Sequence, residues 1–407
     1  METIPGGIDK VGERGMQRLT PLLLVGVLLT WLTPVVAQTP DYIIQSNGAP
    51  MRALVQPPGQ TPRLATPTPT LTPTLTLTPT PAAVRAEAPA SGALAAKPAT
   101  RGKIRIGVIL PTESSALGEA AAVVRSGVEA AAQVDQSAEL YSVDATGDNV
   151  VERYRAAVAD GVNVVIGPLS RESIAKLAPS VTVPTIALNS VDRQAATNPK
   201  LYSLSLIVEG EARQLARLMR DDGRASPLLV VGGDALSQRL GKAFADEWRA
   251  ATGKPVRQMA FNANDLAPLL QAAGQADAVA LALDVAQAAK LKSALTPDVP
   301  VYGTSQLNVG GVQPELAGVR FIDMPWFLMP GHPAVQRYPH PAVPLTRQTE
   351  RLYALGIDAY RLAVQLAVSR PGAAVRLDGV TGDLKLGRDR VFERQLPAGV
   401  MGGNALQ

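Results

Sequence analysis

Short apolar strands that alternate with amphipathic helices constrain this chain more than any other feature, and the alternation begins near residue 103. Lys103–Leu110 is a mostly apolar run, which is typical of a parallel strand buried on both faces. A polar turn rich in hydroxyl groups follows, and Glu119–Ala132 then has the apolar spacing of a helix. Strand, loop and helix form the opening unit of a doubly wound α/β domain, in which ligands bind beyond the carboxyl ends of the strands.

The same alternation continues along the chain and predicts two βα sets of similar size. Strands are expected at residues 103–110, 140–143, 163–168 and 183–188, and in the second set at 227–232, 256–261, 278–283, 301–303 and 319–322. One long helix, Arg347–Ser369, and a closing hairpin from residues 379–386 and 390–395 should follow. We therefore predict an α/β fold of two lobes, with parallel sheets flanked by helices and a cleft between the lobes.

The segments outside residues 103–395 have a different character. Residues 1–37 have the pattern of a signal peptide, because basic residues precede the apolar run Leu22–Leu32, which is short for a membrane span. Export to the periplasm is predicted, and an uncleaved inner-membrane anchor is the alternative. Residues 38–102 are rich in Pro, Thr and Ala, and this composition predicts a disordered tether. Residues 396–407 are expected to form a flexible tail.

The composition excludes several classes of function. Cysteine is absent, which rules out disulfides, a cysteine nucleophile, thiolate metal sites and a lipid anchor on an N-terminal cysteine. The two histidines are too few for an ordinary His-rich metal site, and the small net charge of +4 gives no indication of nucleic-acid binding. No established catalytic or nucleotide-binding motif is complete. The sequence therefore predicts no enzymatic activity, no cofactor and no metal.

Hydroxyl and amide side chains follow several of the predicted strands. These ligand-cleft candidates are Thr112, Ser114, Ser115, Ser170, Asn189 and Ser190. Because the carboxyl ends of parallel strands meet at one edge of a sheet, the six side chains could converge on one crevice and bind a carboxylate or another small anion. Ser, Thr and Asn are also common helix caps and turn formers, and we favour that interpretation.

The stretch Asp323–Pro330 is unusual because it is apolar, aromatic and bracketed by two prolines. We expect no regular element there. Trp326 and Phe327 could pack in the core, or they could form the wall of a cleft or a surface for a partner. Core packing is favoured, with the indole N–H hydrogen-bonded to a polar group.

With these segments in view, residues 103–395 resemble the C-terminal domain of the penicillin-binding protein activator family, LpoA, also called the LppC lipoprotein family. The stretches that carry the resemblance are Lys103–Pro111, Val165–Leu169, Phe321–Phe327, Leu352–Arg361 and Gly379–Gly382. The resemblance implies a periplasmic-binding-protein type I-like fold. It also implies a non-enzymatic regulator that docks on a class A penicillin-binding protein and activates peptidoglycan synthesis. The alternative is a periplasmic binding protein for a small ligand of the amino-acid type.

Overall fold

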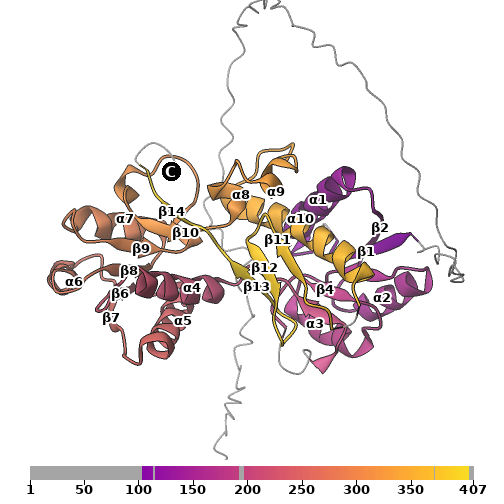
Figure 1. Cartoon of the computed structure of the whole chain (residues 1–407), viewed down its shortest axis with the longest axis horizontal. Coiled ribbons are helices and arrows are strands. Elements are labelled where there is room, and N and C mark those ends of the chain that lie inside the picture. The colour runs from indigo at the N-terminus through magenta and orange to yellow at the C-terminus, as the bar shows by residue number, and fades with distance from the viewer. Residues whose placement is uncertain (1–102, 113–114, 192–196, 371, 403–407) are drawn as a thin grey trace, which may run out of the picture. The chain divides into compact units, whose positions relative to one another are not determined.

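The structure is a computed structural model that describes residues 103–112, 115–191, 197–370 and 372–402 (Figure 1). The predicted signal peptide and tether lie outside the described residues. Two sheets, each parallel or nearly so and flanked by helices, confirm the predicted fold class. We call residues 103–206 and 325–395 lobe 1, and residues 207–324 and 396–402 lobe 2.

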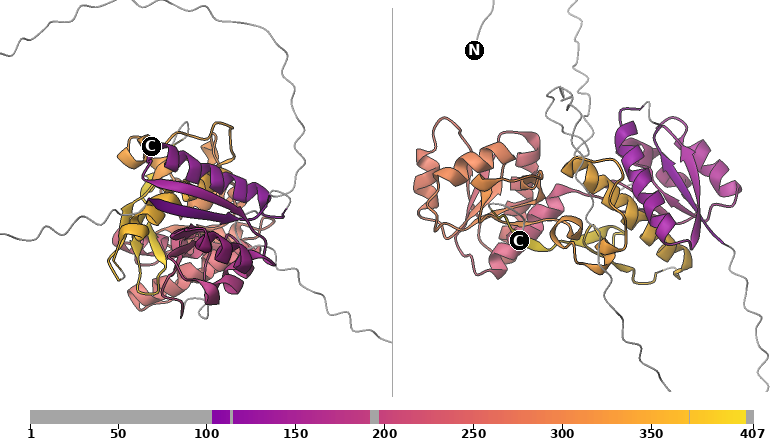
Figure 2. Two further views of the ribbon diagram at one scale, coloured as in Figure 1. Left: turned by 90° about the vertical axis from the view of Figure 1, so that its right-hand side faces the viewer. Right: turned by 90° about the horizontal axis from the view of Figure 1, so that it is seen from above.

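The central sheet of lobe 1 has five parallel strands in the order β2-β1-β3-β4-β5. Their bounds are β1 Ile104–Leu110, β2 Ala138–Asp144, β3 Val164–Ile166, β4 Thr185–Ala187 and β5 Leu201–Ser203. One face packs on α1 (Gly118–Val134) and α10 (Arg347–Val368), and the other packs on α2 (Val150–Ala159) and α3 (Arg171–Leu177), a layering visible in Figures 1 and 2.

Lobe 2 has a six-stranded sheet in the order β14-β10-β9-β8-β6-β7. Its strands are β6 Leu228–Val231, β7 Arg257–Ala260, β8 Val279–Ala282, β9 Val301–Gly303, β10 Arg320–Ile322 and β14 Ala398–Val400. The two faces pack on different helix pairs, α4 (Val208–Asp221) with α5 (Ala235–Thr252) and α6 (Ala267–Ala273) with α7 (Val285–Ala294). Alternate residues of β6 join different hydrophobic clusters, as the two-residue period of a strand requires.

The chain passes between the lobes three times, after β5, after β10 and after a small third sheet. That sheet consists of β11 (Arg376–Asp378), β12 (Asp383–Leu386) and β13 (Phe392–Gln395), all antiparallel. The sequence predicted its last two strands as a hairpin and did not predict β11 or β5. One hydrophobic cluster contains residues of both lobes together with residues of the crossing segments, so the core is continuous across the lobe boundary.

Two predictions for local structure are wrong. Residues 396–407 were expected to be a flexible tail, yet in the described part, up to residue 402, β14 pairs antiparallel with β10 and Met401 is buried. Residues 403–407 lie outside the described residues. The segment Asp323–Pro330 was expected to lack regular structure, yet α8 (Pro325–Leu328) forms a single helical turn. Proline is compatible with the first helical position, because its missing N–H would have no partner within the helix. A further single turn, α9 (Pro333–Gln336), also begins with proline.

The crossing of α1 and α10 depends on two glycines. Gly127 and Gly356 face each other, and a Cβ on Gly127 would overlap the Tyr353 carbonyl while a Cβ on Gly356 would overlap the Val124 carbonyl. Both obstacles are backbone atoms, which cannot rotate away as a side chain can. The absence of side chains at these two positions therefore allows the helices to approach closely and holds α10 in lobe 1.

We predict that Gly127→Ala or Gly356→Ala lowers the free energy of unfolding by about 2 kcal/mol or more, because overpacking forces the helices apart. Gly210→Ala is the matched control. Gly210 also lies in a helix, α4, but a Cβ there meets only Ile207 at 3.9 Å. The control should be neutral or stabilising by up to about 1 kcal/mol. Urea denaturation of the three variants measures the difference, and equal stabilities would contradict the predicted close approach.

Candidate functional site

Five of the six predicted cleft residues lie in the loops at the carboxyl ends of β1, β3 and β4, which are neighbours in the lobe 1 sheet. Ser170 is the N-cap of α3, and its hydroxyl accepts a hydrogen bond from Ser173 N at 3.0 Å. Asn189 donates from Nδ2 to Leu169 O at 3.0 Å and accepts from Ser190 N at 2.7 Å. These contacts join the loops after β3 and β4, so Ser170 and Asn189 have the capping and turn roles that the sequence favoured.

The remaining cleft candidates differ in what their side chains contact. The Ser190 hydroxyl accepts from Arg171 Nε at 3.0 Å. Thr112 and Ser115 form a turn in which Ser115 N donates to Thr112 O at 3.1 Å. Ser115 Oγ is buried and has no hydrogen-bond partner within the described part of the chain. Ser114 lies outside the described residues. Convergence of these side chains on a bound ligand stays a prediction.

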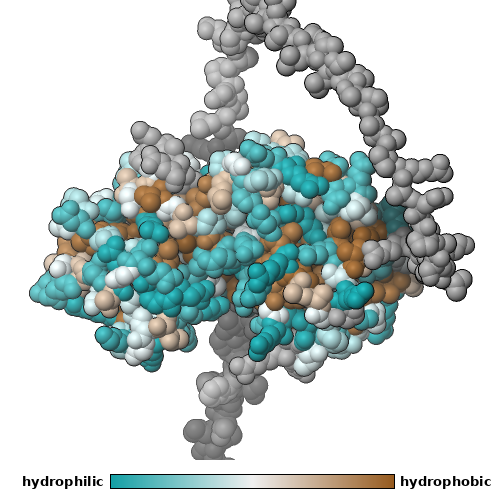
Figure 3. Space-filling model, in the orientation of Figure 1, coloured by the Kyte–Doolittle hydropathy of each residue, from teal (hydrophilic) through white to brown (hydrophobic). Residues whose placement is uncertain are grey.

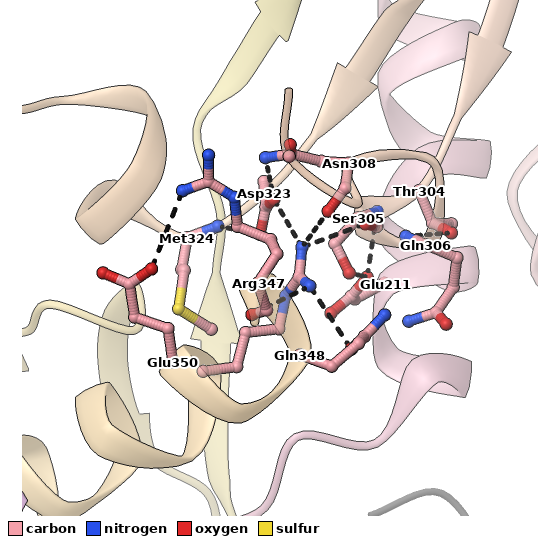
Figure 4. Close-up of polar contacts among 12 residues, drawn as sticks. Glu211, Thr304, Ser305, Gln306, Asn308, Asp323, Met324, Arg347, Gln348 and Glu350 are labelled. Carbon is pink, nitrogen blue, oxygen red and sulfur yellow. Dashed lines mark hydrogen bonds and ion pairs between the residues drawn. The ribbon is translucent and has the colours of Figure 1, made fainter. Parts of the chain in front are cut away.

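A larger polar constellation, which the sequence analysis did not predict, lies where the lobes meet (Figure 4). Its centre is the ion pair between Arg351 Nη2 of α10 and Asp323 Oδ2, 2.7 Å apart, with both side chains almost fully buried. The same Arg351 nitrogen donates to Ser305 O at 3.0 Å, and Asn308 Nδ2 donates to Asp323 Oδ2 at 2.8 Å. Met324 N donates to the other Asp323 oxygen at 2.8 Å. A lobe 1 helix is therefore bonded to two segments of lobe 2, residues 305–308 and Asp323.

Glu211 of α4 continues the constellation. Its carboxylate accepts from Ser305 Oγ at 2.6 Å and lies 3.3 Å from Arg394 Nη2 of β13. Burial raises the pKa of Glu211, and the opposing charge of Arg394 and the Ser305 hydroxyl act in the other direction. Gln214, one turn further along α4, exchanges two hydrogen bonds with the Leu396 backbone, at 2.6 and 3.0 Å. The first crossing and the last crossing are thus bonded to each other.

A second buried carboxylate, Asp358 of α10, holds the turn between β11 and β12. It accepts from Val380 N at 3.1 Å, and from Thr381 N and Oγ1 at 2.8 and 2.7 Å. Burial raises the pKa of Asp358, whereas the nearby Arg361 guanidinium lowers it. Arg394 Nη1 donates to Thr381 O at 3.2 Å, which connects this turn to Glu211. We call the six charged residues Glu211, Asp323, Arg351, Asp358, Arg361 and Arg394 the interlobe network.

Trp326 lies beside this network and confirms the core interpretation. Its side chain is buried, and its Nε1 donates to Glu350 Oε1 at 2.9 Å. The indole packs on the rings of His340 and Tyr353, with centroids 4.6 and 5.9 Å away. Phe327 is also buried, and the Arg347 guanidinium lies over its ring at 4.3 Å. The aromatic pair therefore anchors the second crossing against α10.

The chemistry of the interlobe network is suited to holding the lobes in one fixed arrangement. Each buried carboxylate faces a guanidinium and further hydrogen-bond donors, an arrangement that satisfies buried charge. In the described part of the chain no group of three or more His, Asp or Glu side chains is placed to hold a metal ion. Among the same residues no helix is both long and apolar enough to cross a membrane. The geometry serves to hold the two lobes and the third sheet together.

Parts of this network could have been found from sequence. Asp323, Asp358 and Thr381 lie inside the three stretches Phe321–Phe327, Leu352–Arg361 and Gly379–Gly382, which carried the family resemblance. Arg361, the partner of Asp358, also lies inside one of them. The other network members, Glu211, Arg351 and Arg394, lie outside those stretches, and no local pattern distinguishes them from solvent-exposed charges. Only the tertiary fold brings the two groups together.

Two parallel α/β sheets joined by three crossings define the class of two-lobed, periplasmic-binding-protein-like proteins. The sequence profile described as "LppC putative lipoprotein" matches residues 93–398, so the chain belongs to this family. It is 28% identical over 311 residues to a protein named penicillin-binding protein activator LpoA from Klebsiella pneumoniae, covering 65% of this chain and 44% of that protein. The chain thus spans less than half the length of that relative.

Solved structures that are similar to this one include the following two. One, described as "Structure of a putative branched-chain amino acid ABC transporter from Chromobacterium violaceum ATCC 12472", is 93% identical, covers 74% of this chain and all of that chain, and has a TM-score of 0.72. The other is the LpoA C-domain from Haemophilus influenzae, described as a regulator of PBP1A, at 24% identity and a TM-score of 0.64. It covers 74% of this chain and 98% of that chain, and at this identity it supports the shared fold alone.

We predict that Arg351→Met lowers the free energy of unfolding by about 3–5 kcal/mol, because Asp323 is left as an uncompensated buried charge. The double variant Asp323→Asn/Arg351→Met should recover part of that loss. Lys242→Met is the control, since the Lys242–Asp246 pair is 77% and 65% exposed and should contribute less than about 1 kcal/mol. Chemical denaturation monitored by tryptophan fluorescence gives the values, and an Arg351→Met protein as stable as the parent would contradict the role assigned to this ion pair.

Proposed function

We propose that this chain is a non-enzymatic periplasmic regulator of peptidoglycan synthesis that docks on a class A penicillin-binding protein and activates it. The observation that carries the proposal is the family match, which covers both lobes and the third sheet. The curated relatives in the family are named penicillin-binding protein activators, and a solved relative is described as a regulator of PBP1A. A signal-peptide pattern in residues 1–37 supports a periplasmic location.

The interlobe network supports the non-enzymatic part of the proposal. A catalytic acid or base needs access to a substrate and a proton to transfer. Glu211 and Asp358 are instead buried against guanidinium groups and backbone N–H groups. Their raised pKa values follow from burial inside a structural joint, which is a common cause of such shifts.

The direct test measures glycan polymerisation by the cognate class A penicillin-binding protein, with the full chain added at increasing concentration. The polymerisation rate should rise and then saturate, because a docked activator acts as a stoichiometric partner. A heat-denatured sample of the same protein serves as the control and should have no effect. An unchanged polymerisation rate, together with no binding in a pull-down, would refute the proposed function.

A second candidate function is the binding of a small ligand of the amino-acid type. The 93% identical structure from Chromobacterium violaceum is described as that of "a putative branched-chain amino acid ABC transporter", and this description favours the second candidate. The loops after β1, β3 and β4 would supply the ligand contacts, and the buried Ser115 hydroxyl, which has no hydrogen-bond partner among the described residues, would donate to a carboxylate that enters there. In this function the chain would deliver an amino acid and would need no synthase.

Thermal-shift measurements separate the two functions. If leucine, isoleucine or valine binds, the melting temperature should rise with ligand concentration, as mass action requires. Ser115→Ala should abolish the rise, whereas the control Ser142→Ala, on an exposed position of β2, should retain it. A melting temperature that stays constant for all three amino acids would exclude this candidate and leave the synthase regulator.

A further inference from the structure

Exposed apolar side chains gather around the N-terminal turn of α10. The described residues include seven large hydrophobic side chains that are exposed, and four of them are Val309, Val312, Met329 and Val343. Single exposed hydrophobic residues are normal on a protein surface, but a concentration of them marks an interaction site. Figure 3 shows a face that is largely hydrophilic and carries separate hydrophobic patches.

Arg347 lies close to the segments that carry these four residues. Its guanidinium lies 4.3 Å above the Phe327 ring, two residues before Met329. A Cβ built on Gly310 would lie 3.5 Å from Arg347 Nε, so the loop that contains Val309 and Val312 contacts the same side chain. Val343 precedes Arg347 by four residues, just before the helix N-cap at Thr346. The loop 308–313 belongs to lobe 2 and the segment 328–346 to lobe 1, so the surface crosses the lobe boundary. We call these two segments, together with Arg347, the valine face.

The charged side chains within the valine face are all basic. Residues 328–349 contain no Asp or Glu but include Arg337, His340 and Arg347, and residues 303–314 carry no charge at all. The carboxylates nearby are at the margin, where Asp378 of β11 lies 3.3 Å from His332 Nε2. Glu350 is already engaged by Trp326, His340 and Arg347, and Glu315 follows the loop on its exposed side. A complementary partner surface would therefore combine apolar side chains with carboxylates.

We propose that the valine face is the docking surface for the synthase, and that the surface it meets there is an apolar patch flanked by Asp and Glu side chains. This inference rests on the proposed function and adds to it the place of contact and the chemistry of the partner. A second copy of this chain is a poor partner for the valine face. Pairing two valine faces would place Arg337 and Arg347 of one copy close to the positively charged side chains of the other. Docking across the lobe boundary would also require the lobes to keep one arrangement, which the interlobe network provides.

The test measures binding of the full chain to the cognate class A penicillin-binding protein by biolayer interferometry. Val312→Asp/Val343→Asp should raise the Kd by about tenfold or more, because the new carboxylates would face the apolar groups and carboxylates of the partner. Both positions are highly exposed, at 66% and 71%, so the variant should fold, which its melting temperature checks. Val368→Asp is the matched control, at 49% exposure near the far end of α10, and should bind like the parent.

A Lys pair tests the charge of the partner. Val312→Lys/Val343→Lys should bind clearly more tightly than the Asp pair, and its binding should weaken more steeply with salt. Equal losses for the Lys and Asp pairs would overturn the acidic partner surface.

If the parent binds the synthase and the Asp pair binds equally well, the docking surface lies elsewhere and the proposed function survives. A parent that fails to bind refutes the proposed function and this inference together. Sedimentation checks for self-association. If the parent forms a dimer, the Asp pair is monomeric and synthase binding is unchanged, then the occupant of the valine face is a second copy and the inference is overturned.

Discussion

The ion pair between Arg351 and Asp323 is the interaction on which the arrangement of this protein depends. α10 belongs to lobe 1, because the glycine contact with α1 holds it there. Its second turn extends Arg351 into lobe 2, where one guanidinium nitrogen contacts Asp323, Ser305 and Asn308. Glu211 and Arg394 continue the contact to the last crossing. Because buried charges are costly to separate, a change in the angle between the lobes would have to replace all of these bonds at once.

This constraint bears on the choice between the two functions. Binding proteins that close around a ligand need a joint whose open and closed states differ little in free energy. Here buried hydrogen bonds and an ion pair connect α4 to β13 and to Leu396. A further buried hydrogen bond holds Asp323, which directly follows β10. The hydrophobic core is continuous through the same region. Such a joint favours one arrangement of the lobes. A fixed arrangement suits a regulator that presents a preformed surface to a protein partner, because docking then costs little ordering.

The sequence predicted the parallel strands other than β5, and the helices α1 and α10, because a buried strand requires a short apolar run and a helix that covers a sheet requires an amphipathic one. It failed at β14 and α8. β14 is only three residues long, with a glycine at its centre and a proline before it, so its sequence gives little indication of a strand. It forms because β10 offers an edge for it to pair with. The single turn of α8 depends on a hydrogen bond from Trp326 N to Val380 O, 54 residues later in the chain. Local helix propensity cannot predict a bond to such a distant residue. The described cleft candidates follow the ends of β1, β3 and β4, and their contacts depend on loops that only the fold brings together. Their convergence on a ligand stays a prediction.

The first two turns of α10 connect the joint to the surface. Arg347 and Arg351 are four residues apart and therefore lie on the same side of the helix. Arg347 contacts Phe327 and the loop 308–313, whereas Arg351 reaches the buried Asp323 beneath that loop. Asn308 belongs to both, since its side chain donates to Asp323 and its carbonyl accepts from Arg351 while the exposed Val309 follows it directly. The buried ion pair thus fixes the base of the loop that carries two of the four exposed hydrophobic side chains. A partner bound to those side chains would meet a surface held in place by the same charges that hold the lobes.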